Sequence, residues 1–128
     1  MPLVAALFAI IAGLAHVGFF TLESVTFSRP EVWARFHLSS QAEADIVRPM
    51  ALNQGFYNLF LALGVFGGLL WIASGSVEAG RAVVTFACAC MVGAGVVLVA
   101  TDRRFAASAA FQAVPPLLAI VLTLALSS

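Results

Sequence analysis

The chain has 128 residues, of which 62% are hydrophobic and only 9% are charged. A soluble domain carries about a quarter charged residues, so this composition predicts an integral membrane protein surrounded by a lipid bilayer. Six Arg balance six acidic residues, there is no Lys, and the only cysteines are Cys88 and Cys90. A basic nucleic-acid interface and a disulfide scaffold are therefore excluded.

Four stretches of the sequence contain no Asp, Glu, Lys or Arg. They are Met1–Leu22, Pro49–Val77, Ala82–Thr101 and Phe105–Ser128. A bilayer core of roughly 30 Å requires about 20 apolar residues of helix, so each stretch is long enough to cross once. We therefore expect an all-α fold, an integral membrane four-helix bundle. It forms a single domain over residues 1–128, with spans at about 2–27, 50–73, 82–101 and 105–126.

The first span contains two ionisable residues, His16 and Glu23. Seven helical residues turn through about 700°, so both lie on nearly the same face, about 10 Å apart along the axis. A buried carboxyl group can exchange a proton near neutral pH, which makes Glu23 the candidate catalytic acid or base. His16 would orient Glu23 or act as the partner acid. The alternatives are a His16 bonded to a neighbouring helix and a Glu23 that reaches the interface.

The first loop is the only sizeable segment outside the expected spans. Ser28-Arg29-Pro30-Glu31 predicts a helix start with Ser28 as N-cap. The apolar residues that follow predict a short interfacial helix, or a connector whose aromatic side chains pack on the bundle. Ser40-Gln41-Ala42-Glu43 is a capping box, so helix two is expected to start near residue 41, before the membrane. Pro49 is expected to kink this helix.

Helix two carries a run of polar residues just inside the membrane, Asn53, Gln54, Tyr57 and Asn58. They cover an arc of about 140° of the helix. With Gln112 of helix four at a similar depth, they form a candidate substrate-binding set. Asn and Gln that link neighbouring helices, and a Tyr at the membrane interface, are the alternatives. No metal or other cofactor is expected, because one His and one Glu supply too few ligands.

Small residues and prolines shape the other helices. Gly64 and Gly68 form a GxxxG pattern on helix two, which permits either a homo-oligomer or close packing within one bundle. Gly93 and Gly95 allow close approach to helix three. Pro115-Pro116 is expected to break or bend helix four near its middle, either as a tolerated kink or as the opening of a cavity.

The arginines predict the orientation in the membrane. Five of the six lie in the first and third loops and one, Arg81, in the second. The positive-inside rule therefore places loops one and three in the cytoplasm. Both termini are expected outside, in the periplasm if the protein resides in the inner membrane of a bacterial cell.

The run Asn53-Gln54-Gly55-Phe56-Tyr57-Asn58, followed by Leu59-Phe60-Leu61-Ala62, resembles the signature of a small bacterial integral membrane family, domain of unknown function 1304. The His-to-Glu spacing of its first helix matches His16 and Glu23. Members of that family often have an acid before the His and Met after the Glu, where this chain has Ala15 and Ser24. The resemblance covers nearly the whole chain and implies a four-helix membrane protein, without supplying an activity.

Three functions follow from these residues. The first is a membrane-embedded enzyme that acts on a lipophilic small molecule by acid/base chemistry, such as isomerisation, cyclisation or epoxide opening. The second is a proton-coupled small-molecule exporter or a lipid binder. The third is a non-catalytic membrane partner subunit in which the polar residues serve packing alone.

Overall fold

The computed structural model describes residues 1–126, and in that range it is helical and contains no strand. Four helical segments are long and apolar enough to cross a membrane. They are Leu3–Val25, Gln41–Ala73, Val77–Thr101 and Arg103–Leu126. The expectation of an all-α membrane protein with four apolar helices is therefore confirmed.

Helix α1 spans Leu3–Phe20 and continues into a π-helical turn, η1, over Thr21–Val25. The first loop holds α2 (Pro30–Trp33) and the 3₁₀ turn η2 (Ala34–Phe36). The three remaining long elements are α3 (Gln41–Ala73), α4 (Val77–Thr101) and α5 (Ala106–Leu126), with the 3₁₀ turn η3 (Arg103–Phe105) before α5.

The chain divides into two compact units. The first unit comprises Met1–Ala15 and the chain from Leu61 onward, and the second unit comprises His16–Phe60. Both α1 and α3 contribute residues to each unit. The second unit contains η1, the first loop and the polar run of α3, so it contains most of the candidate site.

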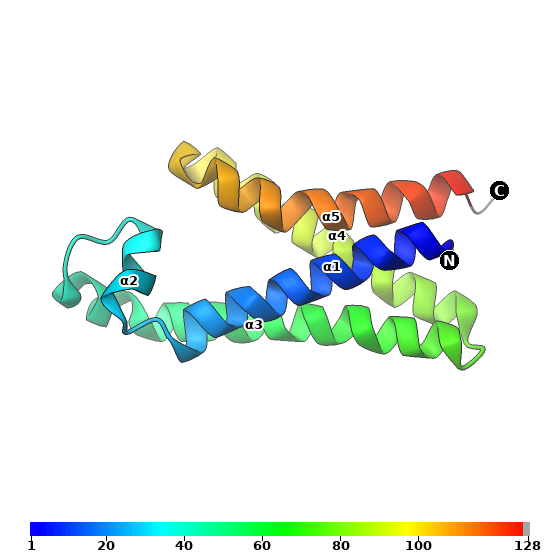
Figure 1. Ribbon diagram of the computed structural model, residues 1–128, viewed down its shortest axis with the longest axis horizontal. Helices are drawn as coiled ribbons and strands as arrows, with labels where there is room; N and C mark the ends of the chain where they lie inside the picture. The colour runs from blue at the N-terminus through cyan, green and yellow to red at the C-terminus, as the bar shows by residue number, and fades with distance from the viewer. Residues whose placement is uncertain (127–128) are drawn as a thin grey trace. The chain divides into compact units, whose positions relative to one another are not determined.

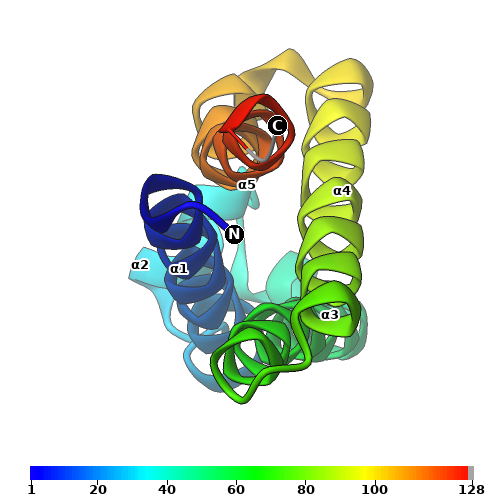
Figure 2. The same cartoon turned by 90° about the vertical axis from the view of Figure 1, so that its right-hand side faces the viewer.

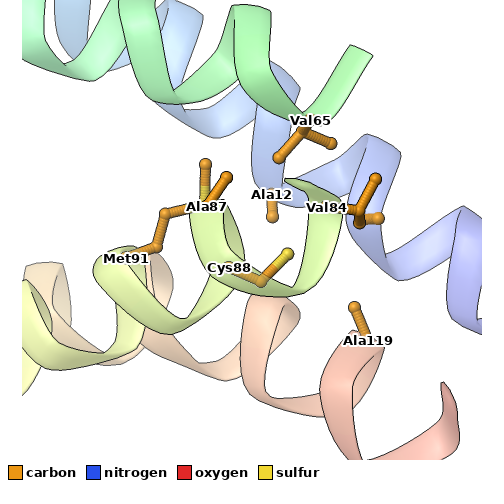
Figure 3. Close-up of a cluster of buried hydrophobic side chains, with 8 residues drawn as sticks. Ala12, Val65, Val84, Ala87, Cys88, Met91 and Ala119 are labelled. Atoms are coloured by element: carbon orange, nitrogen blue, oxygen red, sulfur yellow. The ribbon is translucent and has the colours of Figure 1, made fainter. Parts of the chain in front are cut away.

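The first unit is held together by small residues where its helices meet. In this unit α5 lies between α1 and α4 (Figure 2). Its core contains Ala9, Ala12, Val65, Val84, Ala87, Cys88, Met91 and Ala119 (Figure 3). Four of these eight side chains are alanines, so the backbones approach closely and packing is gained without large side chains.

Glycines permit two close helix crossings in the first unit. A Cβ on Gly68 of α3 would lie 2.7 Å from Val84 Cγ2 and 2.9 Å from the Gly80 carbonyl oxygen of α4. A Cβ on Gly95 of α4 would lie 2.8 Å from Ala113 Cβ of α5. The GxxxG pattern permitted either a homo-oligomer or close packing within one bundle. Gly68 packs against α4 of the same chain, as in the second alternative.

In the second unit, α2 folds back beside the first turns of α3 (Figure 1). Phe27, Ala44 and Ala51 form a small core against which Trp33 and Phe36 pack. The aromatic side chains of the first loop thus pack on α3, as in the connector alternative. The prediction of Ser28 as N-cap is wrong: α2 begins at Pro30 with Arg29 as its N-cap and no side-chain cap hydrogen bond.

The start of α3 is capped as its sequence predicts, with one difference. The Glu43 backbone N–H donates to Ser40 Oγ at 3.2 Å. The Glu43 carboxylate, however, accepts from the backbone N–H of Ser39 at 2.8 Å, one residue before the expected position. Helix α3 then continues without a break through Pro49, and α5 continues through Pro115 and Pro116. Of the break or bend expected at this proline pair, the break is therefore wrong.

Candidate functional site

Glu23 lies in the π-helical turn that ends the first membrane span. The Thr26 backbone N–H donates to the Thr21 carbonyl oxygen at 2.9 Å, a bond across five residues rather than the four of an α-helix. The Thr26 hydroxyl donates to the same oxygen at 3.2 Å, and the Thr21 hydroxyl donates to the Val17 carbonyl at 3.0 Å. Hydroxyl side chains thus satisfy carbonyls at the helix end, and such wide turns are frequent at functional sites.

The Glu23 carboxylate is held by a residue of α3. The Asn58 side-chain amide donates to Glu23 Oε2 at 3.0 Å. Asn58 is buried, with 5% of its surface exposed, whereas Glu23 is half-buried. Within the described part of the chain, Asn58 is the one hydrogen-bonding partner of the Glu23 side chain. The carboxylate is therefore fixed through one oxygen, and its other oxygen can accept or deliver a proton.

Gly55 lets η1 approach α3 at this point. A Cβ on Gly55 would overlap Ser24 Oγ and would lie 3.0 Å from Ser24 Cβ and 3.1 Å from Glu23 Cβ. The Ser24 hydroxyl donates to the Leu52 carbonyl oxygen of α3 at 2.8 Å. This second hydrogen bond between η1 and α3 lies next to the Glu23–Asn58 bond. Both contacts therefore require a glycine at position 55.

Aromatic rings form a further contact between α1 and α3. Phe20, at the end of α1, meets Phe56 edge to face, with ring centroids 5.2 Å apart. Phe56 in turn lies beside Phe60, with centroids 6.2 Å apart. The two helices α1 and α3 are therefore also joined by an apolar contact.

The structure separates the predicted site residues into three groups. Glu23 and Asn58 are hydrogen-bonded to each other. The other three polar residues of the α3 run are exposed: Asn53, Gln54 and Tyr57. His16 is fully buried and meets Phe19 edge to face, and Gln112 lies on α5 in the first unit. Asn58 is thus the one member of the α3 run that contacts the carboxylate.

Two residues of the site, Ser24 and Gly55, were not singled out by the sequence reasoning. A signal for them exists in the spacing of Ala51, Gly55 and Asn58, which fall within about 60° of one another on a helix. All three are buried. Two small residues at this spacing mark the face of α3 that is approached by another helix, and Asn58 belongs to that face.

A carboxylate held by an amide can accept or donate a proton. Among the described residues, no three His, Cys, Asp or Glu side chains come together in a group able to hold a metal ion.

Comparison with known proteins shows the family to which the sequence belongs. Residues 10–124 match the family described as Protein of unknown function (DUF1304). No curated protein and no solved structure matches the chain. The match covers nearly the whole sequence, and the chain therefore belongs to this family.

Proposed function

We propose that this protein is a membrane-embedded enzyme that isomerises a lipophilic small molecule by proton transfer at Glu23. The observation that carries the proposal is the Glu23 carboxylate, in a π-helical turn of a membrane span and held through one oxygen by Asn58. An ionisable group at membrane depth costs free energy during insertion, and this cost favours a functional role over a packing role.

Isomerisation requires fewer catalytic groups than cyclisation or epoxide opening. A carboxylate removes a proton from a carbon next to a carbonyl group or double bond, and the resulting carboxylic acid returns a proton to a different carbon. The protons balance with one residue and without a co-reactant. Epoxide opening needs an added nucleophile, and Ala15 stands where family members often carry a second acid. A single carboxylate therefore favours isomerisation.

Asn58 is proposed to position the carboxylate, and Phe20 and Phe56 to contact the apolar part of the substrate. His16 lies about 10 Å from Glu23 along the helix axis. His16 is fully buried, so the proposed proton transfer rests on Glu23 alone and assigns His16 no contact with the substrate.

The site is proposed to lie in the cytoplasmic half of the membrane. Arg29, Arg35 and Arg48 of the first loop, with Arg103 and Arg104 of the third, support a cytoplasmic location of these two loops. The membrane is proposed to be the inner membrane of a bacterial cell. The substrate would then enter from the cytoplasmic leaflet.

The proposal is tested by comparing lipid-soluble extracts of cells that express the wild type, Glu23→Gln or Glu78→Gln. Glu78 is an exposed carboxylate at the start of α4, so it controls for the loss of a charge. We expect two compounds of identical mass and different chromatographic retention, whose ratio changes in Glu23→Gln and stays at the wild-type value in Glu78→Gln. Identical extracts from wild type and Glu23→Gln would contradict the proposal.

A further inference from the structure

Ser24 differs from the other hydroxyl side chains in where its hydrogen bond goes. Within the residues that the structure describes, the other hydroxyls that donate a bond give it to a carbonyl three to five residues earlier in the chain: Thr21, Thr26, Ser74, Thr101 and Thr123. Such local bonds are common for Ser and Thr in helices. Ser24 instead donates to the Leu52 carbonyl oxygen of α3, 28 residues away, at 2.8 Å. A bond to a second helix thus takes the place of a local one.

The bonds of Glu23 and Ser24 attach η1 to α3 at two separate points. These two residues are consecutive in η1. Their partners on α3, Asn58 and Leu52, are six residues apart, or about 9 Å along the axis. Gly55 lies midway between the partners, where η1 approaches most closely. One hydrogen bond leaves η1 free to rotate about it, whereas two bonds to points this far apart fix both its position and its rotation.

Ser24 provides the more rigid of the two links. Its hydroxyl is one carbon from the backbone, so its bond to Leu52 constrains the backbone of η1 directly. The Glu23 carboxylate lies at the end of three rotatable bonds and takes up many positions unless the backbone that carries it is fixed. The Ser24 bond therefore reduces the set of positions from which the carboxylate reaches the Asn58 amide. Supporting hydrogen bonds of this kind hold reactive groups in place.

We propose that Ser24 is a positioning residue for Glu23. Its hydrogen bond to the Leu52 carbonyl holds η1 against α3, so that the Glu23 carboxylate meets the Asn58 amide. The importance of this role for activity rests on the proposed proton transfer at Glu23. The positioning itself is a property of the fold, and it is measured without a substrate.

A double-mutant cycle repeated without the Ser24 hydroxyl tests the positioning. Glu23→Ala, Asn58→Ala and the double variant are unfolded by SDS in mixed micelles, with Ser24 present and in a Ser24→Ala background. With Ser24 present, we expect the Glu23–Asn58 coupling to change the unfolding constant about threefold to twentyfold, the range for hydrogen bonds between membrane helices. In Ser24→Ala the coupling should fall below about twofold, the level of additive effects.

Ser74→Ala is the matched control for the lost hydroxyl. It removes a bond of similar length, 2.9 Å to the Trp71 carbonyl, that joins no two helices. The Glu23–Asn58 coupling should keep its wild-type value there. Ser24→Ala is expected to fold, because the Leu52 carbonyl lies inside α3 and keeps the backbone hydrogen bond of the helix.

Two outcomes of the cycle would overturn the proposal. A Glu23–Asn58 coupling of equal size in the wild type and in Ser24→Ala would mean that Ser24 serves packing alone. Loss of the coupling in Ser74→Ala as well would mean that the effect is not specific to Ser24.

A rate measurement connects the position of Glu23 to the reaction. In liposomes that contain the lipid-soluble extract of the host, Ser24→Ala should introduce carbon-bound deuterium from D₂O about tenfold to a hundredfold more slowly than the wild type. Ser74→Ala should react at the wild-type rate. Equal rates in the wild type and Ser24→Ala would overturn the proposal. A wild type that introduces no deuterium would contradict the proposed function, and the coupling would still decide whether Ser24 positions Glu23.

Discussion

The Asn58 side-chain amide donates a 3.0 Å hydrogen bond to the Glu23 carboxylate, and the two residues are 35 positions apart in sequence. It joins the π-helical turn of the first span to the middle of α3. Beside it, the Ser24 hydroxyl bonds the Leu52 carbonyl, and Gly55 leaves room for both contacts. A carboxylate held in this way has a defined position from which to exchange a proton.

The Glu23–Asn58 pair is expected to contribute measurably to folding stability. In a double-mutant cycle of Glu23→Ala and Asn58→Ala, the coupling free energy should be about 0.6–1.7 kcal/mol, as for hydrogen bonds between membrane helices. Unfolding by SDS in mixed micelles measures each variant. Additive effects of the two substitutions, with no coupling, would mean that the bond does not stabilise the fold.

Substitution of Gly55 should disturb the site directly. In Gly55→Ala the new methyl group would overlap Ser24 Oγ, so the Ser24 hydroxyl must turn away from the Leu52 carbonyl, and the Cβ atoms of Ser24 and Glu23, at 3.0 and 3.1 Å, must also give way. We expect a loss of about 1–3 kcal/mol in the free energy of unfolding, the usual cost of overpacking. Gly67→Ala is the matched control on the same helix, because a Cβ there meets nothing within 4 Å. Equal stability of the two variants would rule out the close approach at Gly55.

The crossing of α3 and α4 gives a parallel prediction for the first unit. A Cβ on Gly80 would overlap the Gly68 carbonyl oxygen and lie 2.7 Å from Ile72 Cγ1. Gly80→Ala should therefore lower the free energy of unfolding by about 1–3 kcal/mol. Gly93→Ala, on the same helix with nothing within 4 Å, should raise it by up to about 1 kcal/mol through helix propensity. Thermal or SDS unfolding distinguishes the two, and a tolerated Gly80→Ala would contradict the crossing.

The orientation proposed from the arginines can be measured with single cysteines in the Cys88→Ala, Cys90→Ala background. Ser76→Cys, between α3 and α4, should react with a membrane-impermeant maleimide in intact spheroplasts. Ser39→Cys, before α3, should react only after the membrane is permeabilised. The reverse pattern would invert the orientation, and labelling of both in intact spheroplasts would indicate dual insertion.

The membrane spans could be predicted from the sequence because their signal is local. Four charge-free stretches mark them, and the Ser40 and Glu43 capping box indicates where α3 begins, at Gln41. Of the break or bend expected at the proline pair of α5, the break is absent for a physical reason. A proline pair removes two backbone donors but leaves the helical dihedral angles accessible, and α5 stays continuous through Pro115 and Pro116.

The candidate site was harder to predict because it depends on which face of α3 meets η1. The polar run of α3 covers two faces, and polarity alone does not tell them apart. Asn58 shares the buried face with Gly55, whereas Asn53 and Tyr57 are exposed. The π-helical turn at Glu23 depends on hydroxyl-to-carbonyl bonds of Thr21 and Thr26, which no hydrophobic periodicity reveals.

The most direct test of the central claim is incorporation of deuterium from the solvent. Wild-type protein and Glu23→Gln are reconstituted in liposomes made with the lipid-soluble extract of the host and incubated in D₂O. Because the carboxylic acid exchanges its proton with solvent, the wild type should introduce carbon-bound deuterium into one lipophilic compound, detected by mass spectrometry. Glu23→Gln should introduce none. If the wild type labels no compound beyond the level seen with Glu23→Gln, Glu23 is not the proton-transfer residue proposed here.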